Sequence, residues 1–187
     1  MEETLRFRSS SEFRQWLAKN HRQPEGIWLR IFKKDSGEAS VTYAEALDEA
    51  LCFGWSDGQK RPYDELSWRQ RFTRRRPKSG WSRINTERAE RLIAAGRMKP
   101  AGQAQIDAAK NDGRWTAAYD SQSRATFPAD LLAALDQNAK AKAFFESLNG
   151  ANRYAIAYRL QTAKRPETKQ RRMETILAML ERGEKFH

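Results

Sequence analysis

The apolar residues near the start of the chain first follow the spacing of a helix and then that of a strand. Ser9–Glu12 has the Ser-x-x-Glu spacing of a capping box, so we expect a helix to begin there. Phe13, Trp16 and Leu17 would share one face of this helix. The β-branched and aromatic run Ile27–Lys33 is typical of a strand.

A helix followed by strands is predicted again further along the chain. Thr42–Glu45 is a second capping box and predicts a helix that ends near Phe53–Gly54. Two strands are expected at Trp55–Arg61 and Trp68–Arg74, joined by the connector Pro62–Glu65. Because side chains alternate along a strand, the aromatic residues of the second strand would point to one face and its arginines to the other.

Helical spacing dominates the remainder of the chain. A helix that begins at Thr86 would turn Ala89, Leu92 and Ile93 inward, and a polar helix is expected over residues 101–111. The later helices are predicted from apolar faces at Leu131, Leu132 and Leu135, at Phe144, Phe145 and Leu148, at Tyr154, Ala157, Tyr158 and Gln161, and at Met173, Ile176, Leu177 and Leu180.

These elements indicate an α+β chain. Its N-terminal unit would hold a small, mainly antiparallel sheet with flanking helices, and an all-helical unit would follow. Residues 112–127 are rich in turn-forming residues. We therefore predict an α+β domain over residues 1–112 with a basic strand and loop, a connector over 113–127, and a helical domain over 128–187.

Composition limits the classes of protein that this chain can belong to. With 187 residues, 11% of them aromatic, it can bury a sizeable core and is not expected to be disordered. No apolar run reaches the ~20 residues of a membrane helix. The N-terminus has no apolar signal-peptide region, and the single cysteine fits a reducing compartment, so we expect a cytoplasmic location.

The positive charge is concentrated in the middle of the chain. The formal net charge is +11, and it divides into −2 for residues 1–66, +9 for residues 67–125 and +4 for residues 126–187. Such a charge favours an anionic partner: a phosphate-bearing small molecule, a nucleic acid or a membrane surface.

The most basic stretch is Ser67–Asn85, which holds seven arginine or lysine residues and no acid. Arg69 and Arg71 would project from one face of a strand about 6.5–7 Å apart, close enough to share a phosphate or carboxylate. Asp57, on the preceding strand, could bridge them or orient one toward a ligand. The alternative is a solvated edge that prevents aggregation, and it has about equal weight for Arg74, Arg75, Arg76 and Lys78.

The residues after this strand also suit an anion site. Trp81 could be a core residue or the wall of a pocket, and Ser82 and Asn85 precede a helix whose free N–H groups would favour an anion. The predicted ligand-binding residues are therefore Trp55, Asp57, Arg71, Arg75, Trp81, Ser82 and Asn85. Secondary candidates, which the spacing of a surface helix also explains, are Lys164, Thr168 and Arg172.

The sequence offers little conventional catalytic chemistry. It has two histidines and one cysteine, and it lacks the motifs of phosphate loops, dinucleotide folds, serine hydrolases and zinc proteases. Cys52 lies in an apolar run and is expected to be a buried, inert thiol. We therefore expect no metal and no cofactor, and we assign no reaction.

Several blocks of the sequence together resemble the YdeI/OmpD-associated family, also described as bacteriocin-protection proteins. The resemblance covers nearly the whole chain, through Ala50–Gly58, Arg71–Pro77, Trp81–Asn85, Ala95–Gly102 and Ala163–Arg172. It implies an accessory or stress-protection role linked to porins and the cell envelope, and it implies no particular reaction.

Three hypotheses of function follow from the charge and the resemblance. The leading one is a cytoplasmic accessory protein that binds an anionic ligand in a basic, tryptophan-lined pocket. The first alternative is an enzyme acting on a phosphorylated or carboxylated small molecule, with Asp57 as general acid or base. The second is a protein that binds nucleic acid without sequence preference, which the sequence does not favour. The sequence does not define an oligomeric state.

Overall fold

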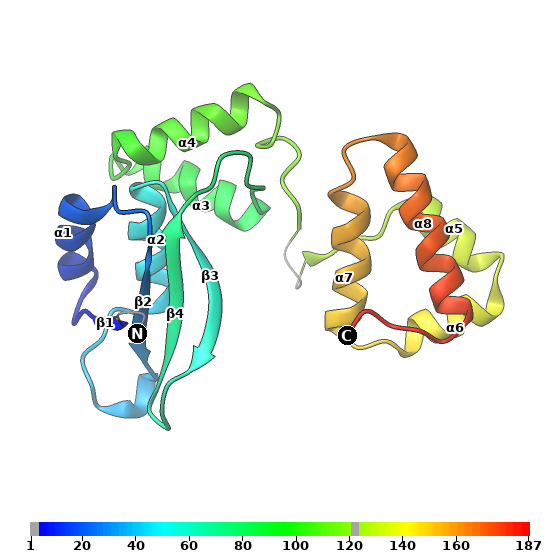
Figure 1. Cartoon of the computed structure of the whole chain (residues 1–187), viewed down its shortest axis with the longest axis horizontal. Helices are drawn as coiled ribbons and strands as arrows, with labels where there is room; N and C mark the ends of the chain where they lie inside the picture. The colour runs from blue at the N-terminus through cyan, green and yellow to red at the C-terminus, as the bar shows by residue number, and fades with distance from the viewer. Residues whose placement is uncertain (1–3, 121–123) are drawn as a thin grey trace. The chain divides into compact units, whose positions relative to one another are not determined.

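The chain folds into two compact units (Figure 1), and the computed structural model describes residues 4–120 and 124–187. The first unit contains the chain up to Gly80 together with Asn85–Thr116. The second contains Trp81–Ile84 together with Ala117–His187. The second unit is therefore assembled from two separate segments of the sequence.

A four-stranded sheet forms the centre of the first unit. Its strands are β1 (Thr4–Arg6), β2 (Ile27–Phe32), β3 (Trp55–Pro62) and β4 (Ser67–Arg74), in the order β1-β2-β4-β3. The β2–β4 and β3–β4 pairs are antiparallel, and the β1–β2 pair is parallel. The three longer strands were predicted, whereas β1 has only three residues and is too short to show alternation in the sequence.

The two faces of the sheet have different chemistry. Phe72 of β4 lies opposite Ile27 and Asp57, and it is fully buried against the Phe13 ring at a centroid distance of 5.9 Å. This is the face that the helices cover. Arg71, one residue before Phe72, lies opposite Trp28 and points to the other face. The register thus separates an apolar face from an arginine-bearing one.

Two helices with capped N-termini pack on the apolar face. In α1 (Ser10–Asn20), the Ser9 side chain accepts a hydrogen bond from the Glu12 N–H. In α2 (Tyr43–Cys52), Thr42 and Glu45 form a complete capping box, as the sequence predicts. A 3-10 turn, η1 (Lys34–Ser36), precedes α2. Each cap fixes where its helix begins, and the apolar spacing then fixes which side is buried.

Two more helices complete the first unit. The helix α3 (Arg83–Ala94) begins three residues before the predicted Thr86, and α4 (Pro100–Asn111) has a proline at its first position. Ala89 and Leu92 are buried as predicted, but Ile93 is 37% exposed. The prediction for Ile93 was wrong because two adjacent helical residues point about 100° apart, and Leu92 takes the inward direction.

Two buried carboxylates of α2 are each held by two arginines. Glu49, with 2% of its side chain exposed, accepts a hydrogen bond from Arg14 Nη1 at 2.6 Å and another from Arg97. Asp48 accepts from Arg88 Nη1 at 2.6 Å and from Arg91 Nη2 at 2.8 Å.

The arginine pair around Asp48 also sets its pKa. Burial alone would raise the pKa of Asp48, but the hydrogen bonds and charges of Arg91 and Arg88 outweigh it, so this pKa lies below its ordinary value. These ion pairs connect α2 to α3, while those of Glu49 connect it to α1 and to the loop after α3.

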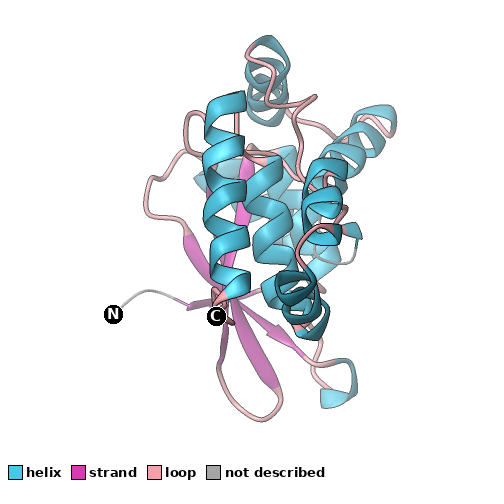
Figure 2. Cartoon of the chain, turned by 90° about the vertical axis from the view of Figure 1, so that its right-hand side faces the viewer, coloured by secondary structure: helices cyan, strands magenta, loops and turns pink. Residues whose placement is uncertain are grey.

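The second unit is a helical bundle. Figure 2 colours the helices and strands of the chain and shows the strands gathered in one group. Its helices are α5 (Ala129–Asp136), α6 (Ala139–Ser147), α7 (Gly150–Gln161) and α8 (Pro166–Glu181). Its core contains Leu131, Leu135, Ala141, Phe145, Ile156, Leu160, Met173, Ile176 and Leu180.

The predicted apolar faces of α5, α6 and α8 are largely observed. In α7 the core contains Ile156 and Leu160 instead of the predicted face, and Tyr158 of that face is 39% exposed. Phe144, Leu148 and Leu177 pack at the edge of the core. Leu132 is 45% exposed and was wrongly expected inside, for the same geometric reason as Ile93: its neighbour Leu131 takes the inward position.

The structure confirms the predicted α+β class, with strands and helices in the first unit and helices in the second. Within residues 4–120 and 124–187, no helix is long and apolar enough to cross a membrane.

Candidate functional site

A hollow of about 640 Å³ lies beside the C-terminal half of β4, on the arginine-bearing side of the sheet. We call it the arginine pocket. Among the residues that the structure describes, five arginines line it, against a single carboxylate, that of Glu25. The lining residues are Pro24, Glu25, Trp28, Gly58, Gln59, Arg61, Arg71, Thr73, Arg74, Arg75, Arg76 and Pro77.

An indole ring forms the base of this cationic surface. The guanidinium carbons of Arg61, Arg69 and Arg71 lie 5.0, 4.8 and 5.6 Å from the centroid of Trp28. They cover the ring so fully that Trp28 is only 2% exposed. The negative face of the indole attracts each cation, which offsets part of the repulsion between three like charges. The sheet therefore assembles a dense positive surface without burying a bare charge.

Backbone carbonyl groups hold several of the pocket arginines in place. Arg71 donates to the Glu25 carbonyl oxygen, Arg74 Nη1 donates to that of Arg22 at 3.1 Å, and Arg75 Nη2 to that of Gly80 at 2.5 Å. The Arg75 N–H also donates to the Gly54 carbonyl oxygen at 3.0 Å. These bonds orient the guanidinium groups.

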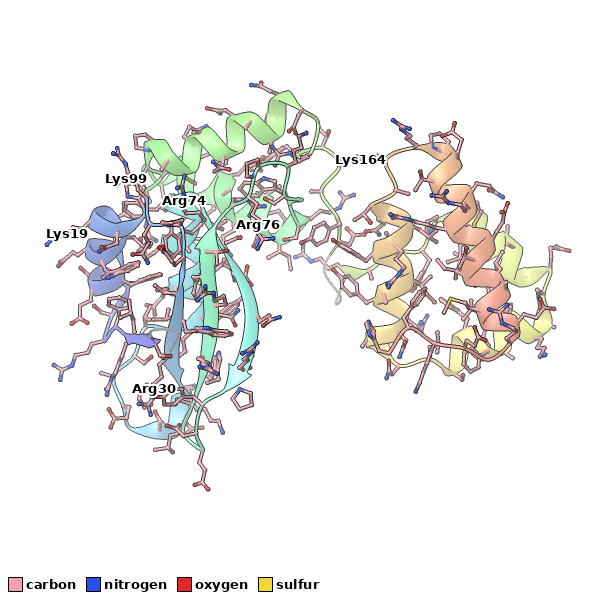
Figure 3. The ribbon with its side chains drawn as sticks, viewed as in Figure 1. Lys19, Arg30, Arg74, Arg76, Lys99 and Lys164 are labelled. Atoms are coloured by element: carbon pink, nitrogen blue, oxygen red, sulfur yellow. The ribbon has the colours of Figure 1, made fainter. Side chains whose placement is uncertain are left out.

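Arg76 extends the pocket toward solvent. It is exposed, and its side chain has no hydrogen-bond or ion-pair partner in the described part of the chain. Figure 3 shows Arg74 and Arg76 near the end of the sheet where α4 begins, while Arg30 lies at the opposite end. Arg30 forms an ion pair with Asp64, at 2.5 Å between Nη2 and Oδ2.

Two of the predicted ligand-binding residues, Arg71 and Arg75, line the arginine pocket together. Trp55 lies elsewhere: it is fully buried, stands edge-on to Trp16 at 5.9 Å, and its Nε1 donates to the His21 carbonyl oxygen at 2.8 Å. Trp55 belongs to the core between the sheet and α1.

Asp57 is on the helix-covered side of the sheet, opposite Phe72, so it does not bridge the arginines of the other side. Its Oδ2 accepts a hydrogen bond from the Tyr43 hydroxyl at 2.6 Å. Burial and this hydrogen bond raise the pKa of Tyr43, so the phenol stays protonated and donates at neutral pH. A β-bulge between Asp57 and Lys60 shifts the strand register just beyond this residue.

The remaining predicted residues are divided between the units. Trp81 and Ser82 belong to the second unit, where the Tyr119 N–H donates to the Trp81 carbonyl oxygen at 3.0 Å and Ser82 forms a β-bridge with Tyr119. Trp81 is 2% exposed, which fits the core interpretation of its side chain. Asn85 is half-buried in the first unit, in the first turn of α3.

The secondary candidates lie on or near α8 of the second unit. Arg172 Nη1 donates to the Arg159 carbonyl oxygen at 2.6 Å, which fastens α8 to the end of α7. Thr168 is half-buried in α8, and Lys164 is exposed in the loop before it (Figure 3).

Sequence reasoning missed Trp28, Arg61 and Glu25 as lining residues of the pocket. Trp28 and Arg61 come from β2 and β3, and only the strand register brings them beside Arg71. Trp28 lies in the predicted strand Ile27–Lys33, but the face to which it points depends on that register. In the described ranges, no group of three or more histidine, cysteine, aspartate or glutamate residues could hold a metal ion.

The chain thus has two parts, and a different family model matches each of them. Residues 5–105 match the domain of unknown function DUF8412 over more than half of the 187 residues, so the chain belongs to that family. Residues 124–183 match the family described as Bacteriocin-protection, YdeI or OmpD-Associated, which confirms the suspected family for this segment. The match does not extend over nearly the whole chain, and the earlier blocks, from Ala50–Gly58 to Ala95–Gly102, lie in the DUF8412 match. No match was found among curated proteins or solved structures.

Proposed function

We propose that this chain is an accessory or protection protein that binds an anionic ligand in the arginine pocket. The match of residues 124–183 supports the accessory role. The observation that carries the binding proposal is the convergence of five arginines with one carboxylate on a single hollow. The cytoplasmic location remains part of this proposal and is based on the sequence.

The electrostatics of the pocket favour an anion over water. Like charges gathered on one surface repel one another, and an anion placed between them removes that repulsion. Arg71 and Arg75 are already oriented by carbonyl groups, so little side-chain entropy is lost when they bind. Exposed Arg76 would close on the ligand from the solvent side. A phosphate or carboxylate group matches the paired donors of a guanidinium.

The test is calorimetric titration of the full chain with inorganic phosphate and pyrophosphate at low ionic strength. We expect Arg76→Gln to weaken binding about fivefold, which corresponds to about 1 kcal/mol for one exposed charge contact. The matched control is Arg8→Gln, since Arg8 is also exposed but does not line the pocket. The control should bind like the unaltered chain.

Glu25→Gln should change the affinity for the anion in the opposite direction. It removes the one carboxylate that lines the pocket, so it should strengthen anion binding, and the gain should shrink as salt screens the charges. Absence of binding by both anions at low salt, or equal effects of Arg76→Gln and Arg8→Gln, would refute the proposal. Much tighter binding of a short oligothymidylate, with a steep salt dependence, would instead favour nucleic acid as the ligand.

A further inference from the structure

A second hollow, of about 720 Å³, lies on the other side of the end of β4, and we call it the helix pocket. The end of α1, the residues after α2, the end of β4 and the first turn of α4 surround it. Its volume falls within the roughly 300–1,000 Å³ of typical small-molecule sites. Arg74 and Arg75 line both pockets, because they stand where the strand ends.

The walls of the helix pocket are largely apolar. Ala18 of α1, Phe53 after α2, and Ala101 and Ala104 of α4 all line it. Small side chains on two helices leave the space open, and the Phe53 ring gives it one flat aromatic wall. An apolar body placed there would be removed from water, which favours binding in proportion to the area covered.

Close backbone packing builds this hollow before any ligand arrives. Gly54 has φ +76°, and a Cβ there would lie 2.7 Å from the Ala101 carbonyl oxygen. The Lys99 N–H donates to the Cys52 carbonyl oxygen at 3.1 Å. The end of α2 is therefore fastened to the start of α4, and the distance between the pocket walls is fixed by main-chain contacts.

The rim of the helix pocket is cationic. Arg22, Arg74 and Lys99 line it, and no carboxylate is among the described residues that do so. The side chains of Arg22 and Lys99 are exposed and have no hydrogen-bond or ion-pair partner in residues 4–120 and 124–187. Figure 3 shows Lys99 and Arg74 at this same end of the sheet.

Elsewhere in the same unit, arginines are paired with acids. Arg14 and Arg97 hold Glu49, only a short distance along the chain from Arg22 and Lys99. The cations of the rim therefore differ from their neighbours in having charge available for an outside anion.

We propose that the helix pocket binds an organic anion with a compact apolar body. The body would lie against Phe53 and the alanines, and the anionic group would lie between Arg22, Arg74 and Lys99. This site is separate from the arginine pocket, which is more polar in its lining and lies on the opposite side of the sheet. The two pockets share Arg74 and Arg75, so the variants that test the helix pocket are placed at residues that line it alone.

Phenyl phosphate is a suitable probe, because inorganic phosphate and phenol represent its two halves. In calorimetric titration of the full chain, phenyl phosphate should bind at least about tenfold more tightly than either half, since both parts of the pocket contribute. With ¹³C-labelled alanine methyl groups, phenyl phosphate should shift the resonances of Ala18, Ala101 and Ala104. Inorganic phosphate alone should shift these methyl resonances much less.

Two pairs of variants locate the site. Ala104→Leu would fill the hollow and should abolish the advantage of phenyl phosphate, whereas Ala108→Leu, one turn further along the exposed side of α4, should preserve it. Arg22→Gln combined with Lys99→Gln should weaken phenyl phosphate binding about tenfold or more, and Arg8→Gln should not.

Several results would overturn this inference. One is equal binding of phenyl phosphate and inorganic phosphate to the unaltered chain. Another is an Ala104→Leu variant that binds phenyl phosphate as the Ala108→Leu variant does. Weaker phosphate binding in Arg76→Gln, with phenyl phosphate binding retained, would support two sites. Failure of the arginine pocket and failure of the helix pocket therefore give different results.

Discussion

Replacing Glu49 by glutamine tests how much the first unit depends on its buried ion cluster. The Glu49 side chain is 2% exposed, whereas its partners Arg14 and Arg97 are 27% and 40% exposed. Glutamine has nearly the same shape but removes the negative charge. Its amide NH2 group is a hydrogen-bond donor, so it cannot accept from Arg14 or Arg97 as the carboxylate oxygen does. The substitution thus isolates the charge from the packing.

The expected loss of unfolding free energy follows from the burial of the three groups. Removing one partner of a buried ion pair costs about 3–5 kcal/mol, because the other charge is left uncompensated. Arg14 and Arg97 can both reach water, which places Glu49→Gln near the lower end, at about 3 kcal/mol. For a protein of this size, that corresponds to a decrease of about 6–12 °C in the midpoint of thermal unfolding.

Urea unfolding followed by tryptophan fluorescence measures this quantity, because most tryptophans of the sequence lie in the first unit. Glu38→Gln is the control: its ion pair with Arg6 is 47% and 39% exposed, and such surface pairs contribute about 0–1 kcal/mol. A Glu49→Gln variant that loses less than about 1 kcal/mol, or no more than Glu38→Gln, would refute the reasoning.

Three further predictions concern the same unit. The folded-state pKa of Asp48 is depressed, so its ion pairs stabilise the fold above the ordinary pKa of aspartate, and this stabilisation is lost as pH falls. Measured by urea unfolding from about pH 5 downward, the stability of Asp48→Asn should therefore depend less on pH than that of the unaltered chain. Gly26 and Gly37 both have positive φ, but only at Gly26 would a Cβ collide with the Phe72 carbonyl oxygen, so Gly26→Ala should destabilise the chain by at least about 1 kcal/mol more than Gly37→Ala in the same measurement. Burial raises the pKa of the Cys52 thiol, so Ellman's reagent should label it slowly in the folded chain and rapidly in urea; rapid labelling of the folded chain would contradict its burial.

The sequence predicts the elements of this fold better than it predicts which way their side chains point. The capping box at Thr42 and Glu45 specifies a local hydrogen-bonding pattern, and the structure contains it. Ile93 and Leu132 each lie beside another apolar residue, and local spacing alone does not decide which of two neighbours is buried. That choice is made by the rest of the core.

The sequence also predicts only part of the candidate site, because the direction of its side chains depends on strand pairing and helix packing. The alternation of β4 places Arg71 away from Phe72 without any tertiary information. Asp57 was expected near Arg71, but the pairing register sets it opposite Phe72 and so on the other face. Arg22 and Lys99 become neighbours of one hollow only through the packing of α1 and α4, which no local pattern encodes.

The division of the sequence between the two units has a consequence for how the chain folds. Arg83 forms an ion pair with Asp120 at 2.7 Å, and Tyr119 bonds to Trp81, so the second unit uses residues that precede the long segment Asn85–Thr116. Closing that segment into a loop has an entropic cost, which is smaller once α3 and α4 are already folded. We expect the first unit to form early and assist the second. A fragment that begins at Ala117 would lack the strand partner of Tyr119 and should unfold more readily than the same region of the intact chain.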